Sequence, residues 1–219
     1  MEQNSTSMNI YNVIILDESG SMSSIYNQAL MGINEALSGI RRNQEEFPGQ
    51  KHFVSIVTFE GDGIKGIKNR RDRVPIESVA DFTKKDYRPG GCTPLYDAMG
   101  KTLNELEGLI HEDDRVFATI ITDGYENSSE EYSGTAIKAL VGRLREKGWT
   151  FAYIGANQDS VEVARDLNIS NAINFDATPE GTLEMSVRYR KANRKFADMM
   201  FCKKTIVKSL DGLFDDIDK

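Results

Sequence analysis

The sequence predicts an α/β fold: a doubly wound, mostly parallel central sheet with one antiparallel edge strand and helices on both faces. Short, continuous apolar runs recur along the chain, which is typical of strands covered on both faces. Segments with helical apolar spacing separate these runs, and this alternation favours parallel strands joined by crossover helices. A Gly-Asp-Gly turn at 61–63 follows the second run and predicts a hairpin, whose second arm is the antiparallel edge strand.

The strands are predicted from the apolar runs themselves. The first run, "IYNVIILD", and the later run "RVFATIITD" each end at an aspartate, Asp17 and Asp123. The last run, "NAINFD", predicts only a weak strand. In chain order the predicted strands cover residues 10–17, 52–60, 63–71 as the hairpin partner, 115–123, 149–156 and 171–176.

Helices are predicted between the strands from apolar residues at helical spacing. The first begins at Ile25 and ends near Pro48 and Gly49. The last begins at Thr178, whose hydroxyl can cap the helix while Pro179 lies in its first turn. The predicted helices cover residues 25 to about 48, 95–111, 135–148, 159–167 and a final segment from 178.

The composition indicates a globular protein with one main domain. Of the 219 residues, 39% are hydrophobic and 28% are charged, and the net charge of −7 argues against a nucleic-acid partner. No apolar segment is long enough for a signal peptide or a membrane span, so we expect a cytoplasmic protein with no membrane partner. Cys92 and Cys202 are too few for a disulfide framework, and His52 and His111 are expected at the surface.

Oxygen-bearing side chains stand where two predicted strands end and a helix begins. Asp17, Ser19 and Ser21 follow the first strand in "DESGS", Asp123 follows "IIT", and Thr93 precedes Pro94 and a helix. Sites in open α/β sheets form beyond the carboxyl ends of the strands, so we expect these residues to meet. They offer oxygen and neither nitrogen nor sulfur, which suits Mg²⁺, Mn²⁺ or Ca²⁺ rather than zinc.

A simpler interpretation of the same residues is helix capping. Ser and Asp at a strand–helix junction commonly cap backbone amides, and Thr93 before Pro94 fits the start of a helix. Capping and metal binding are compatible, because a hydroxyl oxygen has two lone pairs.

The three segments together resemble a known family. "DESGS" at 17–21, "CTP" around Thr93 and "TDG" around Asp123 resemble the von Willebrand factor A (vWA) domain, also seen as the inserted domain of integrins. That domain has a Rossmann-like fold and a metal-ion-dependent adhesion site (MIDAS), written Asp-x-Ser-x-Ser with a distant Thr and a distant Asp. The resemblance implies that Ser19 and Ser21 contact the cation directly, and Thr93 directly or through water. It implies that Asp17 and Asp123 act mostly through water and by hydrogen-bonding the serines.

The resemblance implies a metal-dependent protein–protein interaction module. Neutral hydroxyls leave the charge of a bound cation, here Mg²⁺, Mn²⁺ or Ca²⁺, poorly neutralised, so it can accept an Asp or Glu side chain of a partner. The alternative is a metal-assisted hydrolase or phosphatase that uses the same acidic cluster. That alternative lacks a clear general base, since only Glu18 and Glu126 flank the site.

We expect the chain to divide into a flexible N-terminus (1–9), a vWA-like domain (10–202) and an acidic, amphipathic C-terminal tail (203–219). Ile206, Leu210, Leu213 and Ile217 recur at helical spacing, which predicts a short helix that Gly212 weakens. The tail either covers its own domain or places one carboxylate in the metal site of a neighbouring molecule, which would cause self-association.

Overall fold

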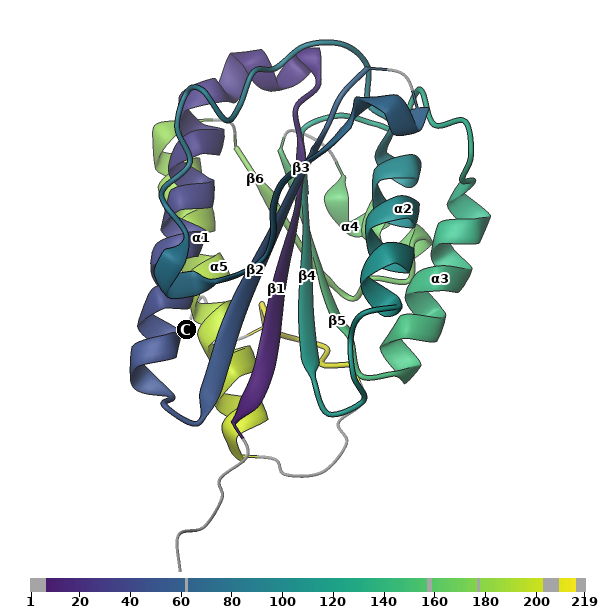
Figure 1. Cartoon of the computed structure of the whole chain (residues 1–219). Helices are drawn as coiled ribbons and strands as arrows, with labels where there is room; N and C mark the ends of the chain where they lie inside the picture. The colour runs from purple at the N-terminus through teal and green to yellow at the C-terminus, as the bar shows by residue number, and fades with distance from the viewer. Residues whose placement is uncertain (1–6, 62, 157–158, 177, 203–208, 216–219) are drawn as a thin grey trace, which may run out of the picture.

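The structure is a computed structural model that describes residues 7–61, 63–156, 159–176, 178–202 and 209–215. Its centre is a six-stranded sheet in the order β3-β2-β1-β4-β5-β6. All neighbouring strands run parallel except β2 and β3, which pair antiparallel at one edge. Helices cover both faces (Figure 1). The predicted fold class is therefore confirmed.

The elements alternate along the chain as the sequence predicts. The strands are β1 (Met8–Asp17), β2 (Gln50–Phe59), β3 (Ile67–Pro75), β4 (Arg115–Thr122), β5 (Thr150–Ala156) and β6 (Asn171–Phe175). The α-helices are α1 (Tyr26–Glu46), α2 (Leu95–Glu107), α3 (Gly134–Glu146), α4 (Ser160–Asp166) and α5 (Pro179–Cys202). Short 3₁₀ helices are η1 (Gly20–Ile25), η2 (Gly63–Gly66) and η3 (Ile76–Ser78).

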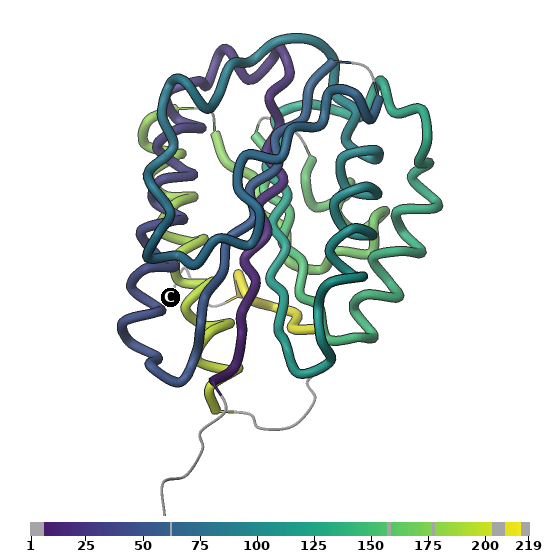
Figure 2. The backbone as a smooth tube through the Cα atoms, in the orientation of Figure 1, coloured from purple at the N-terminus to yellow at the C-terminus, as the bar shows by residue number. Residues whose placement is uncertain are grey.

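Successive residues of β1 point to two separate cores. Ile14 and Leu16 pack with α1 and α5 on one face, and Val13 and Ile15 pack with α2 and α3 on the other. Figures 1 and 2 show the sheet between these two helix layers. Because β2 lies on one side of β1 and β4 on the other, the chain changes direction at β1. The topological switch point therefore lies between β1 and β4, where α/β sheets form their sites.

Several predicted boundaries were wrong. The hairpin arm begins at Ile67 rather than at 63, because residues 63–66 form η2. The backbone of Gly66 there packs so closely on Glu60 that a Cβ atom on Gly66 would lie 1.5 Å from the Glu60 carbonyl oxygen. Helix α2 ends at Glu107 rather than at 111, and the Leu109 amide donates a hydrogen bond to the Leu106 carbonyl in the turn that follows. Strand β1 begins at Met8, inside the segment predicted to be flexible; residues 1–6 lie outside the described residues.

His52 is buried, contrary to the prediction, whereas His111 is exposed as predicted. Strand β2 begins two residues earlier than predicted, at Gln50, so His52 lies inside the strand. Its Nε2 atom lies 3.0 Å from Oε1 of Gln50. Burial lowers the pKa of His52 to about 4, so this side chain is neutral near pH 7.

The described part of the tail, residues 209–215, contains no helix, and the predicted helix is wrong there. Gly212 adopts a positive φ of 68°, which a right-handed helix does not allow. Leu210, Leu213 and Phe214 are buried in the core on the α1 and α5 side. The side chain of Asn171 bonds the Leu210 carbonyl and the Leu213 amide at 2.8 Å each. This segment of the tail therefore covers its own domain.

The two longest helices, α1 and α5, contain 21 and 24 residues. Both carry charged residues throughout their length. Across the residues that the structure describes, no helix is long and apolar enough to cross a membrane.

Leu213→Ala should lower the free energy of unfolding by about 2–4 kcal/mol, because a fully buried leucine leaves a cavity when it is truncated. Urea unfolding followed by circular dichroism measures the change. Leu183→Ala is the matched control, since Leu183 on α5 is 59% exposed and its truncation should change stability by less than about 0.5 kcal/mol. Equal effects of the two variants would mean that the tail does not contribute to the core.

Candidate metal centre

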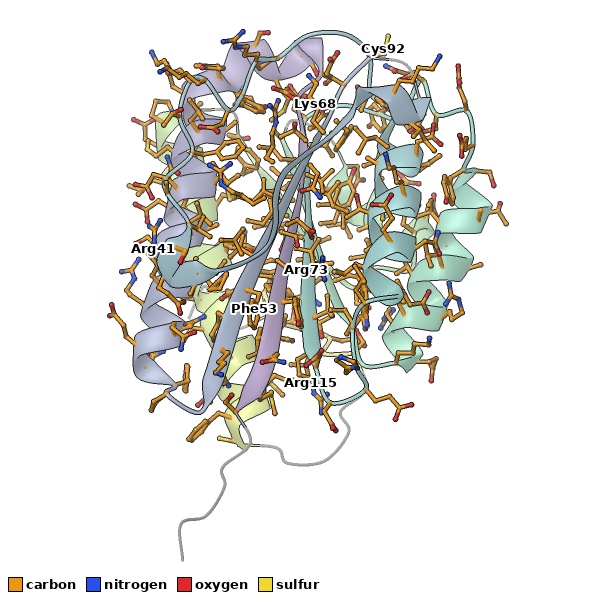
Figure 3. The ribbon with its side chains drawn as sticks, in the orientation of Figure 1. Arg41, Phe53, Lys68, Arg73, Cys92 and Arg115 are labelled. Atoms are coloured by element: carbon orange, nitrogen blue, oxygen red, sulfur yellow. The ribbon has the colours of Figure 1, made fainter. Side chains whose placement is uncertain are left out.

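The predicted residues lie at one end of the sheet, at the switch point. Asp17 is the last residue of β1, and Asp123 follows directly after the last residue of β4, Thr122. Thr93 reaches the same end on the segment before α2, beside Cys92. Figure 3 labels Cys92 at this end of the molecule and Arg115, the first residue of β4, toward the other.

Asp17 is fully buried and held by hydrogen bonds on both carboxylate oxygens. The Ser19 amide donates to Oδ1 at 2.7 Å, and the Thr122 hydroxyl donates to Oδ2 at 2.6 Å. The hydroxyl of Tyr87 donates to the Asp17 carbonyl at 2.7 Å. Burial raises the pKa of Asp17 to about 6, and the nearby charge of Asp123 adds to the rise, while the bonds from Thr122 and Ser19 oppose it.

The two serines connect Asp17 to Asp123. Oγ of Ser19 lies 3.1 Å from Oγ of Ser21, and the Ser21 hydroxyl donates to Oδ1 of Asp123 at 2.6 Å. Ser21 is exposed and Asp123 half-buried, so this side of the cluster faces solvent. Partial burial also raises the pKa of Asp123, against the bond from Ser21.

Thr93 is brought to the cluster by Asn127. The Thr93 amide donates to Oδ1 of Asn127 at 2.8 Å, and the Asn127 amide donates to the Thr93 carbonyl at 3.2 Å. Thr93 itself is only 3% exposed. The Thr93 hydroxyl thereby faces the space beside Gly124.

Gly124 marks the point at which the three segments meet. A Cβ atom added to it would lie 3.4 Å from Oγ1 of Thr93, 3.5 Å from Oγ of Ser21 and 3.9 Å from Oδ2 of Asp17. The glycine keeps open a small space that these oxygens surround. With the hydrogen bonds to Ser19 and Asp123, the structure brings all five predicted residues together.

Helix capping does not account for the three hydroxyl side chains. Ser19 precedes η1 but makes no capping bond with its side chain, and Ser21 lies inside η1. Helix α2 begins at Leu95 with Pro94 in the capping position, so Thr93 lies outside the helix. The hydroxyls of Ser19 and Ser21 bond within the cluster instead.

The donor set suits a hard divalent cation. It consists of two carboxylates and three hydroxyls, and oxygen is the ligand that Mg²⁺, Mn²⁺ and Ca²⁺ prefer. Among the described residues, no group of three or more His, Cys, Asp or Glu side chains is placed to hold a metal. Binding at this cluster would therefore depend on the hydroxyls.

Four residues that shape the cluster escaped prediction as site residues: Thr122, Tyr87, Asn127 and Gly124. Thr122 and Gly124 flank Asp123 in the quoted "TDG", so the motif itself contained that signal. Tyr87 and Asn127 lie in two different loops, and their side chains bond the Asp17 carbonyl and the Thr93 amide, respectively. The sequence contains no local signal for either contact.

The two candidate general bases are engaged elsewhere. The Glu18 side chain is fully buried and accepts two bonds from Arg70 at 2.8 and 2.9 Å. Glu126 accepts bonds from the Tyr96, Ser128 and Ser129 amides at 2.7–3.0 Å, and from the Ser129 hydroxyl.

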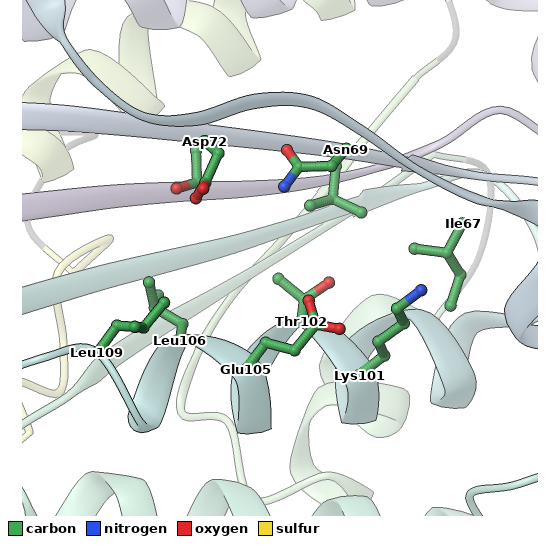
Figure 4. Close-up of a pocket in the computed structure, with 10 residues that line it drawn as sticks. Ile67, Asn69, Asp72, Lys101, Thr102, Glu105, Leu106 and Leu109 are labelled. Carbon is green, nitrogen blue, oxygen red and sulfur yellow. The ribbon is translucent and has the colours of Figure 1, made fainter.

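A separate hollow of about 210 Å³ lies between the edge strand β3 and helix α2 (Figure 4). Its lining includes Asn69 and Asp72 from β3, and Lys101, Thr102 and Glu105 from α2. None of the five predicted site residues lines it, so this hollow is separate from the candidate centre.

Solved structures similar to this chain share one fold. A von Willebrand factor type A protein from Catenulispora acidiphila matches with a TM-score of 0.52 and 18% identity, over 84% of this chain and 43% of that one. The ArnB paralog VWA2 from Sulfolobus acidocaldarius matches with a TM-score of 0.53 and 17% identity, over 84% of this chain and 45% of that one. Manganese-loaded TRAP protein from Plasmodium vivax matches with a TM-score of 0.52 and 14% identity, over 82% of this chain and 72% of that one.

This chain spans less than half the length of the first two structures. No protein-family model matches the sequence, and no curated protein matches it. Sequence identities this low show the fold alone. The structural matches agree with the six-stranded sheet and the two helix layers described above. The chain has the von Willebrand factor A fold.

Proposed function

We propose that this chain is a metal-dependent protein-interaction module that holds a divalent cation with Asp17, Ser19, Ser21, Thr93 and Asp123. Through that cation it would bind an Asp or Glu side chain of a protein partner. The observation that carries the proposal is the space beside Gly124, which oxygens from three separate segments surround.

Each side chain has a distinct part in this arrangement. The hydroxyls of Ser19, Ser21 and Thr93 are neutral oxygen ligands. Asp123 accepts a hydrogen bond from the Ser21 hydroxyl, and the Ser19 hydroxyl lies close enough to donate to the same oxygen, so one lone pair of Ser21 Oγ is left to face the site. Asp17 holds the Ser19 amide and thereby the turn after β1. When bound, the cation would supply a coordination position for a carboxylate oxygen from outside the chain.

Two further observations support the proposal. Ser21 is exposed and Tyr125, two residues after Asp123, is 64% exposed, so a partner can reach this end of the sheet. A protein of the same fold, TRAP from Plasmodium vivax, has been solved manganese-loaded, which supports the binding of a divalent cation. Mg²⁺ is the ion we propose, with Mn²⁺ or Ca²⁺ as alternatives.

No specific observation favours the hydrolase alternative, because the carboxylates of Glu18 and Glu126 are occupied by hydrogen bonds within the chain. Self-association through the tail remains a prediction: Asp211 pairs with Arg145 of its own domain at 2.7 Å, while Asp216 and Asp218 lie outside the described residues. The cytoplasmic location also remains a prediction from the sequence.

Mn²⁺ at one hundred times its dissociation constant should raise the free energy of unfolding of the wild-type chain by about 2.7 kcal/mol, because only the folded chain assembles the three segments. Ser19→Ala should weaken Mn²⁺ binding about tenfold or more, since it removes a proposed ligand. Calorimetric titration and thermal unfolding measure the two effects. Ser23→Ala, an exposed serine of the same turn, is the control and should bind as wild type does. Identical Mn²⁺ binding by both variants would contradict the proposed ligand set.

The apparent affinity for Mn²⁺ should rise steeply with pH up to about 6 and level off above it. The folded chain keeps the Asp17 proton up to a pKa of about 6, and a cation must displace that proton below this pH. Each unit below 6 should therefore cost up to about tenfold in affinity. In metal-free protein the same group should lower stability as the pH rises from about 4 to 6, because the unfolded chain releases the proton first. Titrations at half-unit steps from pH 5 to pH 8 measure the profile, and a flat profile would contradict it.

A partner should be captured from a cell lysate by immobilised wild-type chain in Mg²⁺, but not in EDTA and not by Ser19→Ala. Ser23→Ala should capture the same protein as wild type. Replacing Asp and Glu residues of the captured protein by Asn and Gln, one at a time, should identify one side chain whose loss abolishes binding. Equal capture in Mg²⁺ and EDTA would exclude recognition through a cation.

A further inference from the structure

We propose that the ion pair between the buried Glu18 and Arg70 positions the Thr93 segment at the candidate centre and so sets the affinity of that centre for a divalent cation. This inference rests on the proposed function and assigns Glu18 and Arg70 as positioning residues, not as ligands. The antiparallel edge strand β3 would then influence a site at the ends of β1 and β4, from which β2 separates it.

Glu18 lies between Asp17 and Ser19 in the sequence, but its carboxylate pairs with cations of β3 rather than with the candidate centre. Its side chain is fully buried, and Nη2 of Arg70 donates to its Oε1 and Oε2 at 2.9 and 2.8 Å. Nζ of Lys68 lies 3.5 Å from Oε2. Arg70 and Lys68 both belong to β3, so the edge strand supplies the counter-charge.

The same glutamate fastens the segment that leads to Thr93. The Arg88 amide donates to Oε1 of Glu18 at 2.5 Å, and the Gly90 amide donates to the Glu18 carbonyl at 2.9 Å. Further along both segments, the Gly20 amide donates to the Gly91 carbonyl at 3.1 Å. The segment 88–91 is therefore bonded at three points to the turn that carries Ser19 and Ser21.

Arg70 is itself held in one orientation. Its Nε donates to the Thr58 hydroxyl on β2 at 2.9 Å, and its side chain is 23% exposed. Figure 3 labels Lys68, the neighbouring cation of β3, below Cys92, which precedes Thr93. Three bonds from one planar guanidinium thus connect Thr58 of β2 with Glu18, an arrangement that an ammonium group cannot reproduce in the same geometry.

Positioning and simple electrostatics predict opposite results when Arg70 is removed. A positive charge near a cation site repels the cation, so its removal alone would strengthen binding. A positioning role predicts weaker binding, because an unpaired Glu18 carboxylate no longer stays in its buried place and the 88–91 segment loses its anchor. The sign of the change distinguishes the two.

The test compares Mn²⁺ affinity of the full chain in wild type, Arg70→Met, Arg70→Lys and Arg73→Met, with free Mn²⁺ measured by electron paramagnetic resonance. Arg73→Met is the matched control, since it removes the same charge from the same strand, where Arg73 pairs with the exposed Asp72. We expect about tenfold weaker binding for Arg70→Met. We expect an intermediate loss for Arg70→Lys, and no loss for Arg73→Met. Exchange of the Arg88 and Gly90 amide hydrogens of metal-free protein should be faster in Arg70→Met than in wild type and Arg73→Met.

Unchanged or tighter binding by Arg70→Met overturns the inference while the proposed function stands. Absence of Mn²⁺ binding by wild type overturns both. If Arg70→Met does not fold, Arg70→Lys decides, because it keeps the charge and alters only the geometry. Wild-type affinity in that variant overturns the inference.

Discussion

The fully buried carboxylate of Asp17 is the constraint on which the rest of the site depends. A carboxylate taken out of water is costly unless donors satisfy its oxygens, and each donor here comes from a different segment. The Thr122 hydroxyl comes from the end of β4 and joins it to the end of β1, the neighbouring strand at the switch point. The Ser19 amide comes from the turn after β1 and bends the chain so that the hydroxyls of Ser19 and Ser21 meet. The need to satisfy one side chain therefore fixes the geometry of both loops.

The opposite end of the sheet is held by a different kind of polar contact, one that carries no charge. Asn43 of α1 donates to Asn193 of α5 at 2.6 Å, and Asn193 donates to Asn12 of β1 at 3.2 Å. His52, neutral near pH 7, lies 3.4 Å from Asn12. These buried side chains tie α1 and α5 to the sheet. The fully buried carboxylates of Asp17 and Glu18 thus lie at the end where the site forms, over a scaffold fixed at the other end.

Much of the fold could be predicted because burial on both faces of a parallel strand appears directly in the sequence as an apolar run. The position of Asp17 and Asp123 followed from topology, since parallel strands end at the same side of the sheet. Asn127 and Glu18 could not be assigned in this way. Each acts on backbone groups more than thirty residues away, such as the Thr93 and Arg88 amides, and such contacts leave no periodic pattern. The prediction of a helix in the tail was wrong because of one residue, Gly212. The apolar residues of the tail do pack inward, but the positive φ of this glycine prevents the helix that their spacing predicts.

The distribution of carboxylate charge explains why a site of this composition would remain open to a partner. Asp17 and Asp123 each accept hydrogen bonds from hydroxyls of the chain, which reduces the negative charge they present to the space beside Gly124. Glu18 is adjacent to Asp17 in sequence and would be the natural third carboxylate. Arg70 and Lys68 hold it on the other side of the turn, toward β3. The chain therefore does not fill, with a carboxylate of its own, the position that the proposed function assigns to the acidic side chain of a partner.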